Sequence, residues 1–152
     1  MLQDKDIKCP LIYKGEAYYD YGIHVELGGV YSKKTGIWKN MKSFSNSTEK
    51  LKKAGKKGYL QCGLSLKKGK YKMIYIHIAT HETLNPELPV PQGVTEAEWR
   101  RTPMSVQKII REIYQVNHIN HDTFDYRPKN LEWATPTENV ESWQKHYGKK
   151  VA

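Results

Sequence analysis

The sequence predicts an α+β fold in which an antiparallel β-sheet region is followed by a C-terminal unit of two strands and a helix (ββα). Apolar and polar residues alternate over 60–66 and resume over 71–78 after a short connection that contains glycine, which is typical of a β-hairpin. Residues of the capping-box type precede helical segments near residues 95 and 135. The order strand, loop, strand and helix then fits residues 116–146.

Composition indicates a folded protein with a large positive charge. The chain has 152 residues, of which 38% are hydrophobic and 11% are aromatic, and this is enough apolar material for one compact domain. Lys and Arg number 25 against 16 Asp and Glu, so the formal net charge is +9 at pH 7. A basic protein of this kind most often binds a polyanion, and nucleic acid is the first candidate.

Several classes of protein are excluded on the same grounds. No apolar run approaches the about 20 residues of a membrane-spanning helix, and we expect neither a secretory signal nor a membrane partner. Cys9 and Cys62 are the only cysteines, which is too few for a disulfide scaffold or for a zinc site with four cysteine ligands. We therefore expect a cytoplasmic protein with reduced thiols.

Positive charge is concentrated in the N-terminal half. Residues 33–72 contain thirteen lysines and one acidic residue, Glu49, so this segment alone carries a charge of +12. Lysines at the turns of a sheet can hold DNA phosphates, although charged edges also discourage aggregation. We expect double-stranded DNA as the partner. The lysines assigned to DNA binding are Lys52, Lys53, Lys56, Lys57, Lys67, Lys68 and Lys70.

Changes in composition divide the chain into an expected basic β-rich region (1–90), a helical insert or connector (91–115) and the ββα unit (116–152). A proline-rich stretch over 85–93 leads into the insert. Apolar residues recur at helical spacing over 103–115, and we expect the apolar face of this helix to pack against the rest of the protein.

The C-terminal unit contains residues suited to metal-assisted hydrolysis of a phosphodiester bond. Asn117 lies at the end of one expected strand and Asn139 on the first turn of the helix, so their amide oxygens can converge on a hard cation such as Mg²⁺. His118 has an ordinary pKa of about 6.5, which suits a general base near neutral pH. Asn139 has poor propensity for a helix interior, which favours a functional role.

The same residues resemble the motif of the HNH endonuclease family, particularly its bacteriophage and intron-encoded branch, which is related to homing endonucleases. The resemblance is carried by Asn117-His-Ile-Asn-His-Asp122, Asn130-Leu-Glu-Trp-Ala-Thr135 and Glu138-Asn139, at the spacing of the family. A weaker similarity upstream involves Gly58-Tyr59, residues 75–79 and Asn85-Pro86. The family's Asp-Gly-Asn in the loop is replaced here by Asn120-His121-Asp122.

The resemblance implies a ββα-metal unit and a DNA endonuclease that leaves a 5′-phosphate and a 3′-hydroxyl. It implies that His118 is the general base and that Asn117 and Asn139 bind Mg²⁺ or Mn²⁺. Asn130, grouped with His118 as a catalytic residue, is given a supporting role through hydrogen bonds across the loop. The resemblance also implies a phage origin, and hence a location in the cytoplasm of a bacterial host.

Other assignments leave alternatives open. Arg127 is assigned to phosphate contact but equally fits a solvated side chain, and His77 is assigned to a DNA contact or to packing. The alternative function is a non-catalytic DNA-binding regulator that retains the HNH scaffold. A restriction enzyme or a toxin would use the same chemistry. Nicking by a monomer and double-strand cleavage by a homodimer both fit the motif.

Overall fold

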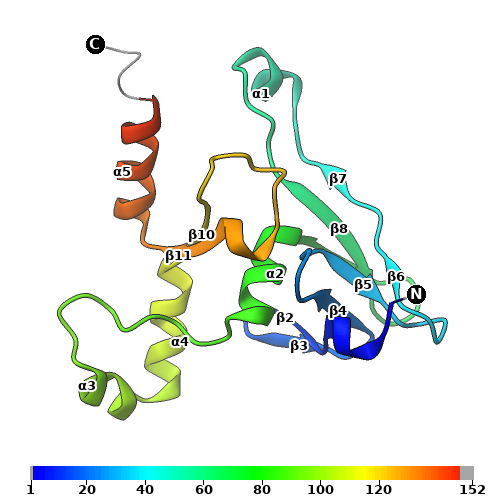
Figure 1. Ribbon diagram of the computed structural model, residues 1–152, viewed down its shortest axis with the longest axis horizontal. Helices are drawn as coiled ribbons and strands as arrows, with labels where there is room; N and C mark the ends of the chain where they lie inside the picture. The colour runs from blue at the N-terminus through cyan, green and yellow to red at the C-terminus, as the bar shows by residue number, and fades with distance from the viewer. Residues whose placement is uncertain (1, 148–152) are drawn as a thin grey trace.

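The fold is α+β, with several small antiparallel sheets and five α-helices in the part of the chain that the structure describes (Figure 1). The structure is a computed structural model and describes residues 2–147. Met1 lies outside the described residues, and so do residues 148–152, the last five of the predicted region 116–152. No helix within residues 2–147 combines the length and the apolar character needed to cross a membrane.

The N-terminal strands are short and form two sheets. A four-stranded antiparallel sheet has the order β1-β4-β5-β6, and a separate hairpin pairs β2 with β3. A 3₁₀ turn, η1, precedes the first strand. The bounds are η1 Asp4–Asp6, β1 Ile7–Lys8, β2 Leu11–Tyr13, β3 Glu16–Tyr18, β4 Tyr21–His24, β5 Val30–Ser32 and β6 Lys39–Asn40.

A third sheet has the order β7-β8-β9 and contains the predicted hairpin. Its strands are β7 (Phe44–Ser45), β8 (Leu60–Ser65) and β9 (Tyr71–Tyr75), and the short helix α1 (Glu49–Lys53) lies between the first two. The hairpin is confirmed, but the prediction that its second strand continues to residue 78 is wrong. The chain instead enters helix α2 (Ile76–Leu84), because a short apolar run fits a buried helix as well as a strand.

Helix α2 lies at the centre of the molecule, where it contacts strands of all the sheets (Figure 1). The largest core cluster surrounds it and includes Leu11, Ile23, Leu64 and Ile74, each 0% exposed. Thr83 on α2 is also fully buried, and its hydroxyl both accepts from the Ile12 N–H and donates to the Ile12 carbonyl. Burial of apolar area and buried hydrogen bonds therefore hold α2 against the N-terminal hairpin.

The insert forms two helices, α3 (Glu96–Arg101) and α4 (Met104–Ile113). Thr95 caps α3 as predicted, since its Oγ1 accepts from the Glu98 N–H at 3.1 Å. The expectation that the apolar face of α4 packs against the protein is wrong, because Met104 is 68% and Ile109 63% exposed. A charged side chain connects α4 to α2 instead, through an ion pair of 3.1 Å between Arg111 and Glu82.

The C-terminal elements appear in the predicted order. Strand β10 (Gln115–His118) pairs antiparallel with β11 (Leu131–Ala134), and α5 (Pro136–Tyr147) follows. A 3₁₀ turn, η2 (Pro128–Asn130), precedes β11. Thr135 caps α5 through the predicted capping box: the Glu138 N–H donates to its Oγ1 at 3.2 Å, and its own N–H donates to the Glu138 carboxylate at 2.9 Å.

The loop between β10 and β11 docks on the N-terminal sheets. Tyr126 from this loop packs against the main core cluster. It also lies over the turn between β4 and β5, where a Cβ at Gly28 would collide with the Tyr126 carbonyl oxygen. Gly28 has φ of +70°, so glycine is required here both by the backbone conformation and by this close approach.

Candidate active site

The hairpin of β10 and β11 presents different residues on its two faces. Gln115 and Asn117 alternate with Val116 and His118 along β10, so the two pairs point to opposite sides. Asn117 is paired in register with Glu132 and His118 with Leu131. Helix α5 packs against both strands, and α2 also contacts both.

His118 is buried beside two other rings. It is 4% exposed, and its ring lies 4.7 Å from that of His77 and 5.9 Å from that of Tyr59, measured between centroids. Burial lowers the pKa of His118, and the carboxylates of Asp122 and Asp125 oppose this only in part. Its Nε2 is buried without a hydrogen-bonding partner among the described residues. His118 is therefore neutral at pH 7 and has a nitrogen that can accept a proton.

The two expected metal ligands are positioned by neighbouring polar side chains. Asn117 donates from Nδ2 to the Glu132 Oε1 at 3.0 Å, and Asn139 donates from Nδ2 to the Gln115 Oε1 at 2.9 Å. Because Gln115 and Asn117 lie on the same face of β10, α5 places Asn139 over the face that carries Asn117. The Asn139 Oδ1 is buried and has no hydrogen-bonding partner within residues 2–147.

This arrangement fits a hard cation. A buried amide oxygen without a partner is costly unless a ligand satisfies it, and amide oxygens suit Mg²⁺. The described residues contain no group of three or more His, Cys, Asp or Glu that could hold a metal ion. Asn139, whose amide oxygen is unpaired among the described residues, and Asn117 are the residues that could hold such a cation, with water and phosphate oxygens as further ligands.

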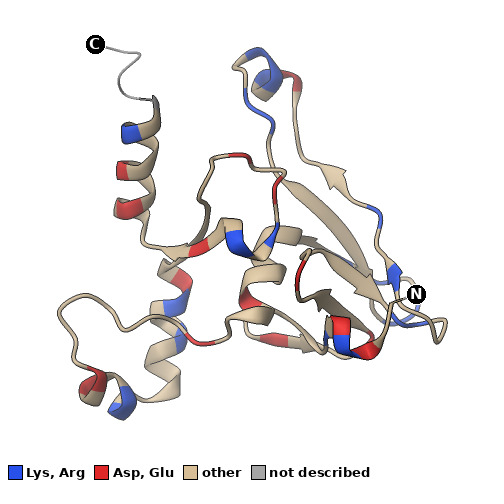
Figure 2. Ribbon diagram, in the orientation of Figure 1, with Lys and Arg blue, Asp and Glu red and all other residues tan. Residues whose placement is uncertain are grey.

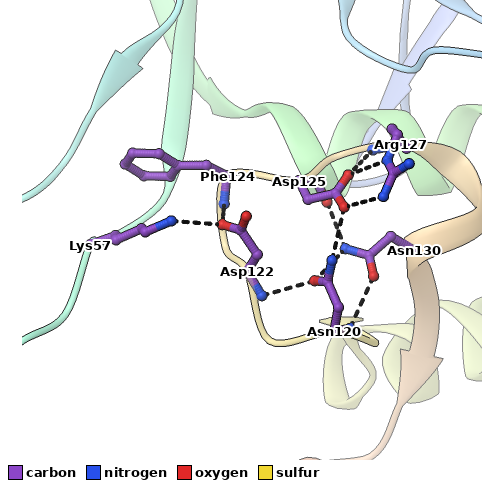
Figure 3. A network of polar contacts seen from close by, with 7 residues as sticks. All are labelled: Lys57, Asn120, Asp122, Phe124, Asp125, Arg127 and Asn130. Carbon is purple, nitrogen blue, oxygen red and sulfur yellow. Dashed lines mark hydrogen bonds and ion pairs between the residues drawn. The ribbon is translucent and has the colours of Figure 1, made fainter.

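Asn130 ties the loop that follows β10 to the start of β11 (Figure 3). Its Oδ1 accepts from the Asn120 N–H at 3.0 Å, and its Nδ2 donates to the Asn120 Oδ1 at 2.9 Å and to the Asp125 carbonyl at 2.8 Å. It is 6% exposed. These hydrogen bonds use both polar groups of the Asn130 amide. They hold in position the end of β10, which carries His118.

Arg127 and Lys57 also belong to this network (Figure 3). Arg127 donates from Nε and Nη2 to the two carboxylate oxygens of Asp125, at 2.8 and 2.6 Å, and these bonds lower the pKa of Asp125 to about 2. Lys57 pairs with Asp122 at 3.1 Å and lies 5.2 Å from the centre of the Phe124 ring. Arg127 pairs with Asp125 and is still 53% exposed, so its assignment to a phosphate contact stays a prediction. Lys57 joins the basic segment to the loop.

The remaining lysines assigned to DNA lie in two groups. Figure 2 shows positive charge gathered around α1, where Lys52 and Lys53 lie, and Lys56 follows that helix. Lys67, Lys68 and Lys70 occupy the turn between β8 and β9. All are exposed. The two groups lie beyond the opposite ends of β8.

His77 is a packed side chain in this structure. It is 6% exposed on the first turn of α2 and stacks on Tyr59 with ring centroids 5.0 Å apart. Burial lowers the pKa of His77 to about 3, and the proximity of His118 and Lys14 adds to this effect. The assignment of His77 as a direct DNA contact therefore gives way to the packing alternative, next to the ring of His118.

Some residues of the site are not predicted by the motif. Glu132 and Gln115 hold the amides of the two asparagines, and both could be inferred by writing out the register of the hairpin from its two strands. Tyr59, whose ring lies beside that of His118, immediately precedes β8 of a different sheet. No signal in the local sequence connects it to this site. A groove of about 1460 Å³ beside these residues is lined in part by Tyr59, Gln115 and Asn139.

Comparisons with known proteins identified no relative of this chain. The chain matched no model of a protein family, no curated protein and no solved structure. The geometry around His118, Asn117 and Asn139 is therefore the basis for assigning a function.

Proposed function

We propose that the protein is a metal-dependent DNA endonuclease that hydrolyses phosphodiester bonds through an HNH site of the ββα-metal type. One observation carries the proposal: His118 Nε2 and Asn139 Oδ1 are buried within the same ββα unit without hydrogen-bonding partners among the described residues. Buried polar groups are normally paired, so an unpaired one calls for an explanation. His77 Nδ1 and His81 Nε2 on α2 are unpaired among the described residues as well, so the proposal depends on where the motif places His118 and Asn139. His118 Nε2 and Asn139 Oδ1 belong to the residues that the motif assigns to proton transfer and to metal binding.

In this function His118 takes a proton from the attacking water. Burial keeps its imidazole neutral at pH 7, so the ring enters the reaction as a base rather than as an acid. Asn130 keeps the end of β10 in place by bonding both sides of the loop. A fixed strand end holds the imidazole in position, which lowers the entropic cost of the reaction. Because His118 and Asn117 point to opposite faces of β10, the phosphate would lie across the end of this strand.

Mg²⁺ or Mn²⁺ would be held by Asn117 and Asn139, with phosphate oxygen and water as further ligands. When bound, such a cation stabilises the charge that develops on the phosphate and on the leaving 3′ oxygen. Glu132 and Gln115 accept from the amide nitrogens, so each asparagine keeps its oxygen for the cation. Two neutral ligands bind a cation weakly, and we expect the metal to enter together with the DNA.

Double-stranded DNA is the proposed partner, and the lysines at the two ends of β8 are its proposed backbone contacts. Their charge lies in a segment of net charge +12 and is exposed. Binding through phosphates releases counterions, so affinity is expected to fall steeply with salt concentration.

One observation favours the second candidate, a non-catalytic DNA-binding regulator with the same scaffold. His118 is 4% exposed and lies under the ring of Tyr59, which is itself 38% exposed. Because His118 Nε2 is itself buried, a phosphate can reach the imidazole only if neighbouring side chains, Tyr59 among them, move. In an endonuclease the side chains around His118 would open to admit the phosphate, whereas in a regulator they would form a closed core.

A supercoiled-plasmid assay separates the two candidates. The wild-type protein is incubated with Mg²⁺ or Mn²⁺, beside an EDTA control and the variants His118→Ala and His24→Gln, the latter replacing a buried histidine of β4 that has no role in the mechanism. We expect metal-dependent open-circle product from the wild type and from His24→Gln but not from His118→Ala. Binding without cleavage of any DNA would favour the regulator, and cleavage by His118→Ala at the wild-type rate would exclude His118 as the base.

A further inference from the structure

The sheet of β7, β8 and β9 has one buried face and one face that is open to solvent. Cys62, Leu64 and Ile74 point into the core and are 0% exposed. The residues that alternate with them point outward, and the register places Tyr71 opposite Ser65, Met73 opposite Gly63 and Phe44 opposite Gln61 on this outer face.

Large apolar side chains occupy this outer face. Tyr71 is 74% exposed, Met73 51% and Phe44 49%. Between them, Gly63 leaves the middle of the face without a side chain, although a Cβ there would meet nothing nearer than the Met73 Sδ at 3.4 Å. Neither the packing nor a positive φ requires this glycine. The outer face therefore carries an exposed aromatic ring on either side of a position without a side chain.

This face continues to His118. Tyr75 follows Met73 on the same side of β9, and its ring meets that of Tyr59 edge-on with centroids 6.1 Å apart. Tyr59 in turn lies 5.9 Å from His118. Ring contacts thus lead from Tyr75 through Tyr59 to the candidate catalytic base, and Met73 and Tyr71 continue the same face toward the turn between β8 and β9.

Positive charge accompanies the row. Lys67, Lys68 and Lys70 immediately precede Tyr71, and Lys42 lies 5.5 Å from the centre of the Phe44 ring. Lysines beside exposed rings match nucleic acid, in which phosphates alternate with flat bases. A duplex keeps the faces of its bases inside its own stack, so a base that stacks on an exposed ring has to be unpaired.

We propose that the outer face of the β7–β8–β9 sheet binds single-stranded DNA by stacking unpaired bases on Phe44 and Tyr71. The inference rests on the proposed function in one respect: the bound strand is directed along Tyr75 and Tyr59 toward His118. The substrate of the endonuclease is then double-stranded DNA that contains an unpaired segment.

Binding of the full chain is measured in EDTA, by fluorescence anisotropy with a labelled single-stranded oligonucleotide and with the duplex of the same sequence. Phe44→Ala and Tyr71→Ala are each expected to weaken single-strand binding about tenfold, within the range known for a base stacked on an aromatic ring. Duplex binding is expected to change less than about twofold. Tyr71→Trp keeps a ring and should keep the affinity. Tyr19→Ala is the matched control, because Tyr19 is 77% exposed on the turn between β3 and β4.

The inference would be overturned if Phe44→Ala and Tyr71→Ala lost equal affinity for the single strand and the duplex, or lost no affinity for the single strand. Failure of the wild type to bind either DNA would overturn it as well, and would instead suggest a protein partner for this face. Because EDTA prevents cleavage, the result does not depend on the nuclease. If the protein cleaves plasmid but Phe44→Ala and Tyr71→Ala do not weaken single-strand binding, the proposed nuclease function stands and this inference fails. If both variants weaken single-strand binding but no plasmid is cleaved, the inference stands and the nuclease function fails.

Discussion

Replacing Glu82 by alanine is expected to lower the free energy of unfolding by about 3 kcal/mol. Glu82 is 2% exposed and accepts three hydrogen bonds: from the Lys14 N–H at 2.7 Å, the Gly15 N–H at 2.8 Å and the Arg111 guanidinium at 3.1 Å. Alanine would leave a partly buried guanidinium and two N–H groups without their acceptor. Glu82 therefore connects α2 both to the β2–β3 turn and to α4.

The magnitude follows from how far each of these groups is buried. Breaking a buried ion pair costs about 3–5 kcal/mol, but the Arg111 side chain is 26% exposed, which moves the cost toward the lower end. The two N–H groups belong to exposed residues of a turn, so water can replace the carboxylate at about 1 kcal/mol or less each. Glu82→Gln retains an acceptor oxygen and should cost about half as much.

Urea denaturation followed by circular dichroism measures these changes. Arg111→Ala combined with Glu82→Ala completes a double-mutant cycle, in which we expect a coupling energy of about 1–2 kcal/mol. Glu96→Ala is the control, because its ion pair with Arg100 is exposed and spans 3.7 Å. A loss below about 1 kcal/mol for Glu82→Ala, or no coupling to Arg111, would refute the role of this carboxylate as the link between α2 and its neighbours.

Further predictions concern pH, a glycine and the loop. Burial lowers the pKa of His77 to about 3 and that of His81 to about 4, so the unfolded chain binds protons first as pH falls below about 6.5. Unfolding free energy should drop by about 4 kcal/mol between pH 8 and pH 5, and His77→Gln with His81→Gln should flatten that profile. Gly28→Ala should cost about 2–3 kcal/mol in urea denaturation, against about 1 for Gly36→Ala, which has a similar φ but open space around it. Asn130→Ala should lower plasmid nicking at least tenfold and speed hydrogen exchange in the loop, since three hydrogen bonds are lost.

Each of these expectations has a contrary result. A pH profile that is the same in the double histidine variant and the wild type would contradict the burial of the two rings. Equal losses for the two glycine variants would contradict the close approach of Tyr126 to the β4–β5 turn. Unchanged exchange in the loop of Asn130→Ala would show that other bonds position His118.

Local signals predicted several elements correctly. Thr95 and Thr135 cap their helices, because a hydroxyl reaches the backbone two or three residues ahead whatever surrounds it. The hairpin of β8 and β9 also follows from alternation alone. The end of β9 could not be predicted, because the apolar run from Ile76 suits either a strand or a buried helix, and the strands around α2 decide between them.

The insert illustrates the same limit. Helical spacing over 103–115 predicted α4, and the helix is present. Whether its apolar face is covered depends on where a second surface lies, which no spacing within the helix reveals. Arg111, on another side of the helix, donates instead to the buried carboxylate of Glu82, which lies 29 residues away in the chain.

By itself the sequence determined which residues could form the candidate site, because the positions of Asn117, His118 and Asn139 on a strand and a helix follow from local patterns. Only the tertiary structure decided their chemical state. The rings of Tyr59 and His77, which lie beside His118, come from segments distant in the chain. Burial and hydrogen bonding set the pKa of an imidazole and the partners of an amide, and both depend on contacts that form only when these segments meet.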